Sequence, residues 1–279
     1  MESLKNVLFE VREHVAHITL NRPAAANAVS LELAEELEEV ARECDESSSV
    51  RAVLLTGAGR IFCGGGDLNS FAAQERSRLP THLRRVNLFF HGAIQRFARM
   101  GAPLLVAVNG NAAGGGMSLA CVGDIVLANE SARFTIAYTR VGLTPDASST
   151  YYLPRIIGLR RTMELMLTNR TLTAREAEAI GLVTRVVPDD QLIAQAESMA
   201  NELAHGPTRA YGGVKRLLYG TTTNPLYEQM ELENESIADM ARSADAQEGI
   251  AAFLAKRPPH STAARRQSVD RTVASEVPV

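Results

Sequence analysis

Two glycine triplets, at 64–66 and 114–116, are the features of this chain best suited to chemistry. Glycine lets the backbone approach a ligand closely and present free N–H groups to it. Two such loops can cradle a phosphate, or can direct two amides at one carbonyl oxygen as an oxyanion hole. Their spacing matches neither the dinucleotide-binding fingerprint nor the phosphate loop with its Lys-Ser/Thr pair. The plain structural alternative is that both triplets are tight turns without function. Their equivalent placement, each after a strand and before a helix, disfavours that alternative.

Strands and helices must hold these loops in place. The apolar runs 52–56 and 104–108 precede the two triplets, and each suits a strand buried on both faces. Apolar spacing predicts a long helix over about 81–100. The other predicted elements are a hairpin of 7–11 and 15–20, a helix capped by Ser30, and strands at 124–128 and 183–187. Strands that alternate with helices indicate an α/β protein.

From about residue 192 onward the chain shows only helical patterns. Asn224 is expected to cap a helix that has Pro225 at its first position, and a last helix over 244–256 should stop before Pro258. The sequence therefore predicts a core at 1–190 that contains the active site, a helical region at 191–259 and a flexible tail at 260–279.

Composition narrows the function classes. The chain has 279 residues, 46% of them hydrophobic, and a net charge of −3, which disfavours disorder and a mainly electrostatic nucleic-acid binder. Cys44, Cys63 and Cys121 are widely spaced. Few, scattered cysteines fit a reducing compartment, and their spacing does not match that of a zinc site. No apolar run approaches the ~18 residues of a membrane span, and the first residues do not resemble a signal peptide. We expect a cytoplasmic protein without membrane or nucleic-acid partners.

Four motifs occur in a specific order. They are Asn-Arg-Pro at 21–23, Phe-Cys-Gly-Gly-Gly-Asp at 62–67, Asn-Gly-Asn-Ala-Ala-Gly-Gly-Gly at 109–116 and Gly-Leu-Thr-Pro-Asp at 142–146. With them the chain resembles the enoyl-CoA hydratase/isomerase (crotonase) superfamily over nearly its whole length. The resemblance implies an α/β fold built as a spiral of ββα units, with a projecting C-terminal helical region through which homotrimers or dimers of trimers (homohexamers) assemble.

The resemblance also implies an oxyanion hole formed by the N–H groups of Gly66 and Gly115. These amides would hold the thioester oxygen of an acyl-CoA and stabilise the enolate that forms when a proton leaves carbon. Coenzyme A is then part of the substrate, and neither a metal nor another cofactor is expected. One scaffold can host many chemistries, so the reaction depends on other side chains.

The carboxylates distinguish the reactions of this family. Its hydratases use two glutamates, which would fall at Ser118 and Tyr138 of this chain. Both glutamates are missing. Instead the chain has Asp146, in the Pro-Asp context of the ring-opened phenylacetyl-CoA type of isomerase. One carboxylate can shift a double bond by taking a proton from one carbon and returning it to another. The structural alternative is that Asp146 caps a helix beginning near Ala147.

A second chemistry comes from the 4-chlorobenzoyl-CoA dehalogenases of the same superfamily. There an Asp at this position attacks the aromatic ring and a His on the long helix activates water, a place that His91 occupies here. Those enzymes hold the Asp with the indole N–H of a Trp where this chain has Tyr138, and the chain contains no Trp. The Tyr138 hydroxyl is a conceivable substitute donor. His91 could equally be a helix histidine satisfied at the edge of the core.

The predicted site has three parts. Asp146, Gly66 and Gly115 are catalytic; Tyr138, His91, Ser118, Phe62 and Met117 line the substrate pocket; Arg22, Ala24, Asp67, Leu68 and Lys256 contact the CoA moiety. Together they predict an enoyl-CoA isomerase of fatty acid or aromatic acid degradation. Dehalogenase-like hydrolysis and enoyl-CoA hydration are the alternatives, and a non-catalytic binding or scaffold protein is less favoured.

Overall fold

The strands form two sheets in the computed structural model, which describes residues 4–259 and leaves the predicted tail at 260–279 outside the described residues. The six-stranded sheet has the order β1 (Val7–Arg12), β2 (Val15–Leu20), β3 (Ala52–Gly57), β5 (Leu104–Val108), β7 (Ile125–Asn129) and β10 (Arg185–Val187). The four-stranded sheet has the order β4 (Ile61–Cys63), β6 (Asn111–Ala113), β8 (Arg133–Thr135) and β9 (Leu172–Thr173). Apart from the β1–β2 hairpin and the β8–β9 pair, neighbouring strands run parallel.

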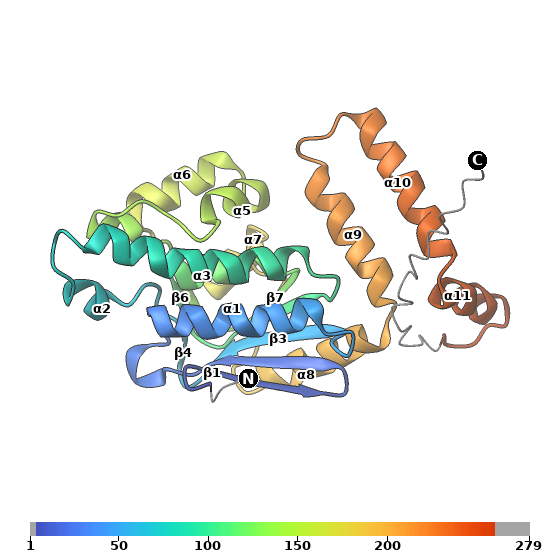
Figure 1. Ribbon diagram of the computed structural model, residues 1–279, viewed down its shortest axis with the longest axis horizontal. Helices are drawn as coiled ribbons and strands as arrows, with labels where there is room; N and C mark the ends of the chain where they lie inside the picture. The colour runs from blue at the N-terminus through green and yellow to red at the C-terminus, as the bar shows by residue number, and fades with distance from the viewer. Residues whose placement is uncertain (1–3, 260–279) are drawn as a thin grey trace, which may run out of the picture.

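Helices cover both faces of the large sheet (Figure 1). They are α1 (Leu31–Glu46), α2 (Leu68–Ala72), α3 (Leu79–Arg99), α4 (Gly115–Ala120), α5 (Ser149–Ile156), α6 (Leu159–Thr168), α7 (Ala174–Ala179), α8 (Leu192–His205), α9 (Thr208–Gly220), α10 (Leu226–Ala241) and α11 (Ala244–Leu254), with 3₁₀ turns η1 (Pro23–Ala25) and η2 (Tyr138–Val141). Alternate residues of β3 belong to different cores. Val53 and Leu55 pack with α1 and α3, whereas Leu54 packs with α8. The expectation of strands buried on both faces is therefore confirmed.

The chain repeats one structural unit as it passes between the sheets. A strand of the large sheet is followed by a three-residue strand of the small sheet and then by a helical segment, as in β3–β4–α2, β5–β6–α4 and β7–β8–η2. This repetition is the predicted spiral of ββα units. Both glycine triplets follow a short strand, so the repeat itself brings the two loops to the same edge of the molecule.

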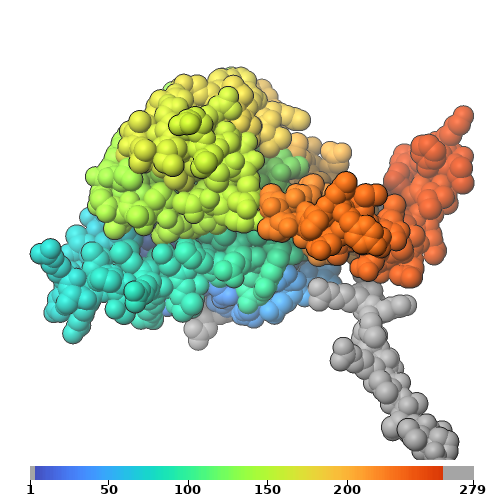
Figure 2. Space-filling view, turned by 90° about the horizontal axis from the view of Figure 1, so that it is seen from above, coloured from blue at the N-terminus to red at the C-terminus, as the bar shows by residue number. Residues whose placement is uncertain are grey.

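The last three helices extend away from this body (Figures 1 and 2). Two buried cations anchor their base. Lys215 on α9 pairs with Asp124 at 2.7 Å and donates to the carbonyls of Phe97 and Ala102, while Arg51 donates to the carbonyl of Gly206. Burial raises the pKa of Asp124, against the opposing effect of Lys215. Beyond α9 the apolar side chains are largely exposed, with Phe253 at 82%.

Several predicted boundaries needed correction. The expected cap at Asn224 is wrong, because α10 begins at Leu226 with Pro225 as its N-cap and the Asn224 amide donates to Gln229 instead. The long helix begins at Leu79 and the last helix ends at Leu254. The strands of the small sheet were missed altogether, since three residues are too few to show a period. The Ser30 cap is confirmed by a hydrogen bond from the Leu33 amide to its hydroxyl.

Candidate active site

The two glycine loops touch each other. A Cβ atom added at Gly65, whose φ is +97°, would lie 2.8 Å from the Ala113 carbonyl oxygen and 3.4 Å from the Cα of Gly114. A Cβ atom at Gly116 would overlap the carbonyl oxygen of Cys63. Only glycine permits such approaches. The triplets are therefore not isolated turns, because each supplies the space that the other needs.

The first loop presents the N–H of Gly66. Gly66 forms an isolated parallel bridge with Val29, in which the Val29 amide donates to the Gly65 carbonyl and the Asp67 amide donates to the Val29 carbonyl. In such a bridge the amide of the central residue points away from the partner segment. The Gly66 N–H is thus directed to the side opposite Val29.

The second loop presents the N–H of Gly115. Gly114, with φ of +50°, is the N-cap of α4, and Gly115 is the first helical residue, whose N–H has no carbonyl within the helix to bond. A Cβ atom at Gly115 would lie 3.9 Å from the Cα of Gly65 and 3.8 Å from the Tyr138 hydroxyl oxygen. The predicted oxyanion-hole residue is therefore close to both the first loop and Tyr138.

Asp146 is held by a small polar network. The Tyr138 hydroxyl donates to its Oδ1 at 2.6 Å, and Ser118 Oγ lies 3.1 Å from the same hydroxyl. The backbone carbonyl of Asp146 accepts from the amide and hydroxyl of Ser149. Burial, followed by the charge of Asp146, raises the pKa of Tyr138, so the phenol stays protonated and donates. Among the described residues nothing donates to Oδ2 of Asp146.

The helix-cap alternative for Asp146 is wrong. α5 begins at Ser149 with Ser148 as its N-cap, and no side chain caps this end. Ala147 and Ser148 both adopt positive φ, +50° and +66°, a conformation that costs L-residues about 1–2 kcal/mol each. Strain of this kind persists only where surrounding contacts impose it, and it is common at functional sites.

His91 supplies one of those contacts. Its Nε2 lies 3.1 Å from the backbone nitrogen of Ala147. A peptide N–H can only donate, so Nε2 accepts and the ring proton is on Nδ1. The His91 ring therefore ties α3 to the peptide that directly follows Asp146.

The remaining predicted site residues are distributed unevenly. Phe62 and Met117 are fully buried in the core beneath the loops, and Ser118 is buried behind Tyr138. Ala24 and Leu68 are exposed, and Arg22 forms an ion pair with Asp67. Lys256, also exposed, follows α11 at the opposite end of the molecule from α2 (Figure 1), so one chain does not bring it to Arg22.

Two groups that sequence reasoning missed contribute to the site. They are the Ala147 peptide, which His91 holds, and the Ser70–His82 pair beside the first loop. The signal that could have pointed to the pair is His82 itself, a polar residue near the start of the long helix.

In the part of the chain that the structure describes, the cysteines are buried and the possible metal ligands do not cluster. Residues 4–259 contain no group of three or more His, Cys, Asp or Glu side chains placed to hold a metal ion. Burial raises the pKa of the Cys63 thiol to about 11 and those of Cys44 and Cys121 to about 12, so none is a ready nucleophile. No described helix combines the length and apolar character required to span a bilayer.

Comparison with known proteins identifies the class. The family model described as enoyl-CoA hydratase/isomerase matches residues 10–263. The chain therefore belongs to the enoyl-CoA hydratase/isomerase family, and its fold is the crotonase fold. A solved enoyl-CoA hydratase from Bacillus anthracis superimposes with a TM-score of 0.87 at 32% identity, covering 93% of this chain and 100% of the other.

Two named relatives bear on the chemistry. The chain is 39% identical to the 1,2-epoxyphenylacetyl-CoA isomerase of Escherichia coli K12 over 92% of its own length and 98% of the relative's. It is 36% identical to the 4-chlorobenzoyl coenzyme A dehalogenase-2 of an Arthrobacter species, over 90% and 91% of the two chains.

Proposed function

We propose that this enzyme shifts a double bond within an enoyl-CoA thioester, with Asp146 as the single acid/base. The observation that carries the proposal is the Tyr138–Asp146 hydrogen bond beside Gly115. Ser118 and Tyr138 stand where hydratases of the family have glutamates, so a water-adding pair of carboxylates is lacking. The 39% identity to a 1,2-epoxyphenylacetyl-CoA isomerase supports an isomerase that acts on a CoA thioester.

The reaction follows from the geometry. The thioester oxygen would accept hydrogen bonds from the N–H groups of Gly66 and Gly115, which stabilise negative charge on it. Oδ2 of Asp146 would take a proton from the α or γ carbon, forming the conjugated enolate, and the same oxygen would return that proton to the other carbon. Tyr138 keeps its own proton and fixes Oδ1 throughout. No metal or redox cofactor takes part in this proposal.

Dehalogenase-like hydrolysis is the second candidate, and one observation favours it. The Tyr138 hydroxyl donates to Asp146, which is the part that an indole N–H plays in those dehalogenases. Asp146 would then attack the ring carbon and expel chloride, and water would cleave the resulting ester. His91 argues against this candidate, because its Nε2 already accepts the Ala147 N–H instead of facing a water.

The proposed enzyme acts in the cytoplasm as a homotrimer or a dimer of trimers. Exposed apolar residues on the projecting helices support assembly: Leu226 and Tyr227 on α10 are 77% and 75% exposed, and Phe253 on α11 is 82% exposed. An exposed apolar face of this kind is typical of an interaction surface. Light scattering of the purified chain should give three or six times the mass of one chain, and a monomer would contradict the proposal.

Asp146→Asn tests the mechanism. The variant keeps the shape of the side chain but cannot accept a proton, so turnover of a 3-enoyl-CoA should fall by at least about 1000-fold while thioester affinity changes little. Asp190→Asn, at an exposed site before α8, is the matched control and should leave turnover unchanged. Retained isomerisation by Asp146→Asn would refute the assignment.

A substrate panel separates the candidates. It contains a 3-enoyl-CoA, 1,2-epoxyphenylacetyl-CoA, crotonyl-CoA and 4-chlorobenzoyl-CoA. Isomerisation of the 3-enoyl-CoA supports the proposal, and turnover of 1,2-epoxyphenylacetyl-CoA alone would instead indicate the reaction that names the Escherichia coli relative. Chloride release from the last substrate favours dehalogenation. Hydration of crotonyl-CoA would point to a hydratase that works without the two glutamates. Failure to turn over all four would favour a binding protein.

A further inference from the structure

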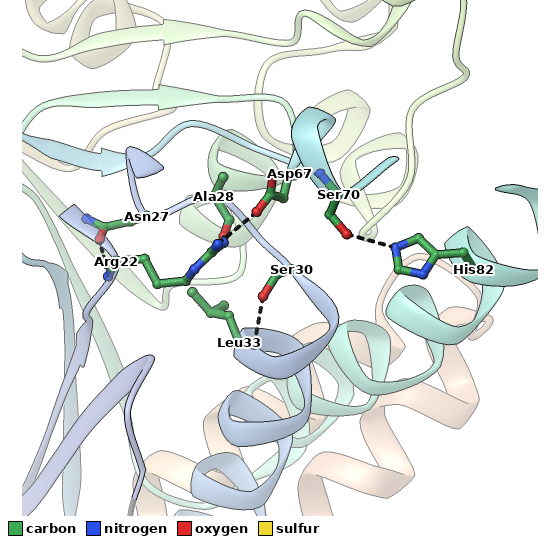
Figure 3. A network of polar contacts seen from close by, with 8 residues as sticks. All are labelled: Arg22, Asn27, Ala28, Ser30, Leu33, Asp67, Ser70 and His82. Carbon is green, nitrogen blue, oxygen red and sulfur yellow. Dashed lines mark hydrogen bonds and ion pairs between the residues drawn. The ribbon is translucent and has the colours of Figure 1, made fainter. Parts of the chain in front are cut away.

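The guanidinium of Arg22 bonds both to the segment before Val29 and to the residue after the first glycine loop (Figure 3). Its Nη1 donates to the carbonyl of Ala28 at 2.5 Å, and its Nη2 donates to Oδ2 of Asp67 at 2.8 Å. Ala28 directly precedes Val29, and Asp67 directly follows Gly66. The two ends of the guanidinium therefore lie on either side of the Val29–Gly66 bridge, which sets the direction of the Gly66 N–H.

Asp67 is fully engaged in this arrangement. While Oδ2 pairs with Arg22, Oδ1 accepts from the Ser70 amide and caps α2. The side chains of Arg22 and Asp67 are 22% and 10% exposed, so both are largely withdrawn from water. Burial by itself would raise the pKa of Asp67, but the hydrogen bonds from Ser70 and Arg22 outweigh it and lower the pKa overall. The pair is therefore charged at neutral pH.

The turn that carries Arg22 is itself fixed. Asn27 is buried, and its Oδ1 accepts from the Arg22 amide while its Nδ2 donates to the carbonyls of Ala58 and Ile61. Asn27 has φ of +52°, a conformation that asparagine tolerates better than most residues. Arg22 therefore starts from a rigid base, so its guanidinium can hold Asp67 in one place.

The far side of the loop is tied to α3. Ser70 Oγ lies 3.2 Å from Nε2 of His82 (Figure 3). The ring of Phe71 packs edge-on against the same imidazole, with 5.9 Å between the ring centroids. Phe71 also adjoins Gly66, since a Cβ atom there would lie 2.8 Å from its ring. Contacts therefore run continuously from Arg22 through Asp67 and α2 to the helix that carries His91.

We propose that Arg22 and Asp67 form a clamp that positions the Gly66 N–H as an oxyanion donor, and that Arg22 is not a contact for a CoA phosphate. The proposal rests on the proposed use of Gly66 in the oxyanion hole. Such donors act only when they are aimed within a fraction of an ångström, and a misplacement of ~1 Å can cost on the order of 100-fold in rate. Arginine suits the task because its planar fork reaches two acceptors at once, which a lysine ammonium on a flexible stem does not reproduce.

The test uses Arg22→Lys and Asp67→Asn, singly and together. Acetoacetyl-CoA and acetoacetyl-pantetheine are the probes, because a working oxyanion hole draws their acyl group into the enolate, which absorbs in the near ultraviolet. Pantetheine thioesters lack the phosphates, so they separate loop positioning from phosphate binding. Turnover of a 3-enoyl-CoA and of its pantetheine counterpart is measured in parallel.

The clamp predicts losses that do not depend on the phosphates. Each single variant should lower the bound enolate and kcat by about 10- to 100-fold on both kinds of thioester, while KM changes less than about threefold. The double variant should lose no more kcat or bound enolate than the less active of the two single variants. Both substitutions disrupt the same Arg22–Asp67 pair, so their effects should not add. Arg175→Lys is the matched control: this arginine pairs with Glu130 and Glu178 on the surface, and its replacement should change nothing.

Three outcomes would overturn the clamp. A loss confined to KM and to the CoA thioesters would make Arg22 a phosphate contact. Unchanged enolate and kcat in folded variants, checked by thermal unfolding, would remove any role for the pair. Absence of an enolate signal in the native protein would show that Gly66 is no oxyanion donor. A native protein that binds the enolate without isomerising any enoyl-CoA would instead refute the proposed function and leave the clamp standing.

Discussion

The two glycine loops have the same Gly-Gly-Gly sequence but differ in the contacts that hold them in place. In the first loop Gly64 is exposed, and side-chain contacts from Arg22 and Asp67 reinforce the backbone bridge between Val29 and Gly66. In the second loop all three glycines are buried, and the backbone holds the segment through the bond from the Gly114 amide to the Thr135 carbonyl. One loop is supported by a polar network at the rim, the other by the closely packed spiral.

Because the two loops are held differently, we expect changes in one to affect stability and changes in the other to affect catalysis. Close packing leaves no room to move, so a change in the second loop should act first on the stability of the whole domain. A polar network at the rim can shift without unfolding the core, so a change in the first loop should act first on the rate. The following predictions test that separation, beginning with the largest expected effect.

Gly116→Ala should be the most damaging single change. The new Cβ would overlap the Cys63 carbonyl oxygen and lie 2.7 Å from the Cys63 Cβ, and neither atom can move without shifting β4. We expect a loss of about 3 kcal/mol in the free energy of unfolding, measured by urea denaturation followed by circular dichroism. Gly249→Ala is the control, since a Cβ there meets nothing within 4 Å. Normal stability of Gly116→Ala would contradict the contrast between the loops.

Gly66→Ala should harm catalysis more than folding. Its Cβ would meet only the ring of Phe71, a half-buried side chain that can turn away. We expect kcat to fall by about 100-fold as the N–H shifts, with a loss of stability below about 1 kcal/mol. The second substitution Phe71→Ala should recover part of kcat by removing the collision. If stability falls as far as in Gly116→Ala, the rim loop is no more tolerant than the buried one.

Tyr138→Phe tests how the second loop is linked to the carboxylate. The change removes the donor to Asp146 and one of the hydrogen-bond partners of Ser118 but keeps the ring beside Gly115. We expect kcat to fall by about tenfold, with KM nearly unchanged, because the Asp146 carboxylate remains but is no longer oriented by the hydrogen bond from Tyr138. Ser118→Ala, which leaves the Tyr138–Asp146 bond intact, should have a smaller effect. A larger loss in Ser118→Ala would mean that Ser118 has a direct role.

The sequence predicts the strands and glycine loops better than the polar contacts between distant residues. Apolar runs such as 104–108 identify buried strands, and the paired triplets indicate loops of equivalent placement, because both signals are local. The contact between Arg22 and Asp67 joins residues 45 positions apart, and that between His91 and Ala147 joins residues 56 apart. No spacing rule encodes such pairs, since they depend on how the spiral places its turns. A helix cap at Asp146, the structural alternative to a catalytic role, has a sound local basis, but α5 begins at Ser149 and the Asp146 side chain bonds Tyr138 instead.

Acid pH offers the mildest test of the polar support of the first loop. The pKa of folded Asp67 is lowered, so the unfolded chain binds its proton at higher pH than the folded chain does. The stabilisation is therefore complete above the unfolded pKa of about 4 and is lost as pH falls through the lower, folded pKa. The stability advantage of the native protein over Asp67→Asn should stay constant from about pH 7 to 5 and shrink below about pH 4. Urea denaturation at fixed protein concentration measures it, with Asp190→Asn as the exposed control. An advantage that stays unchanged down to pH 3 would mean that the charge of Asp67 adds nothing to the stability of the folded chain.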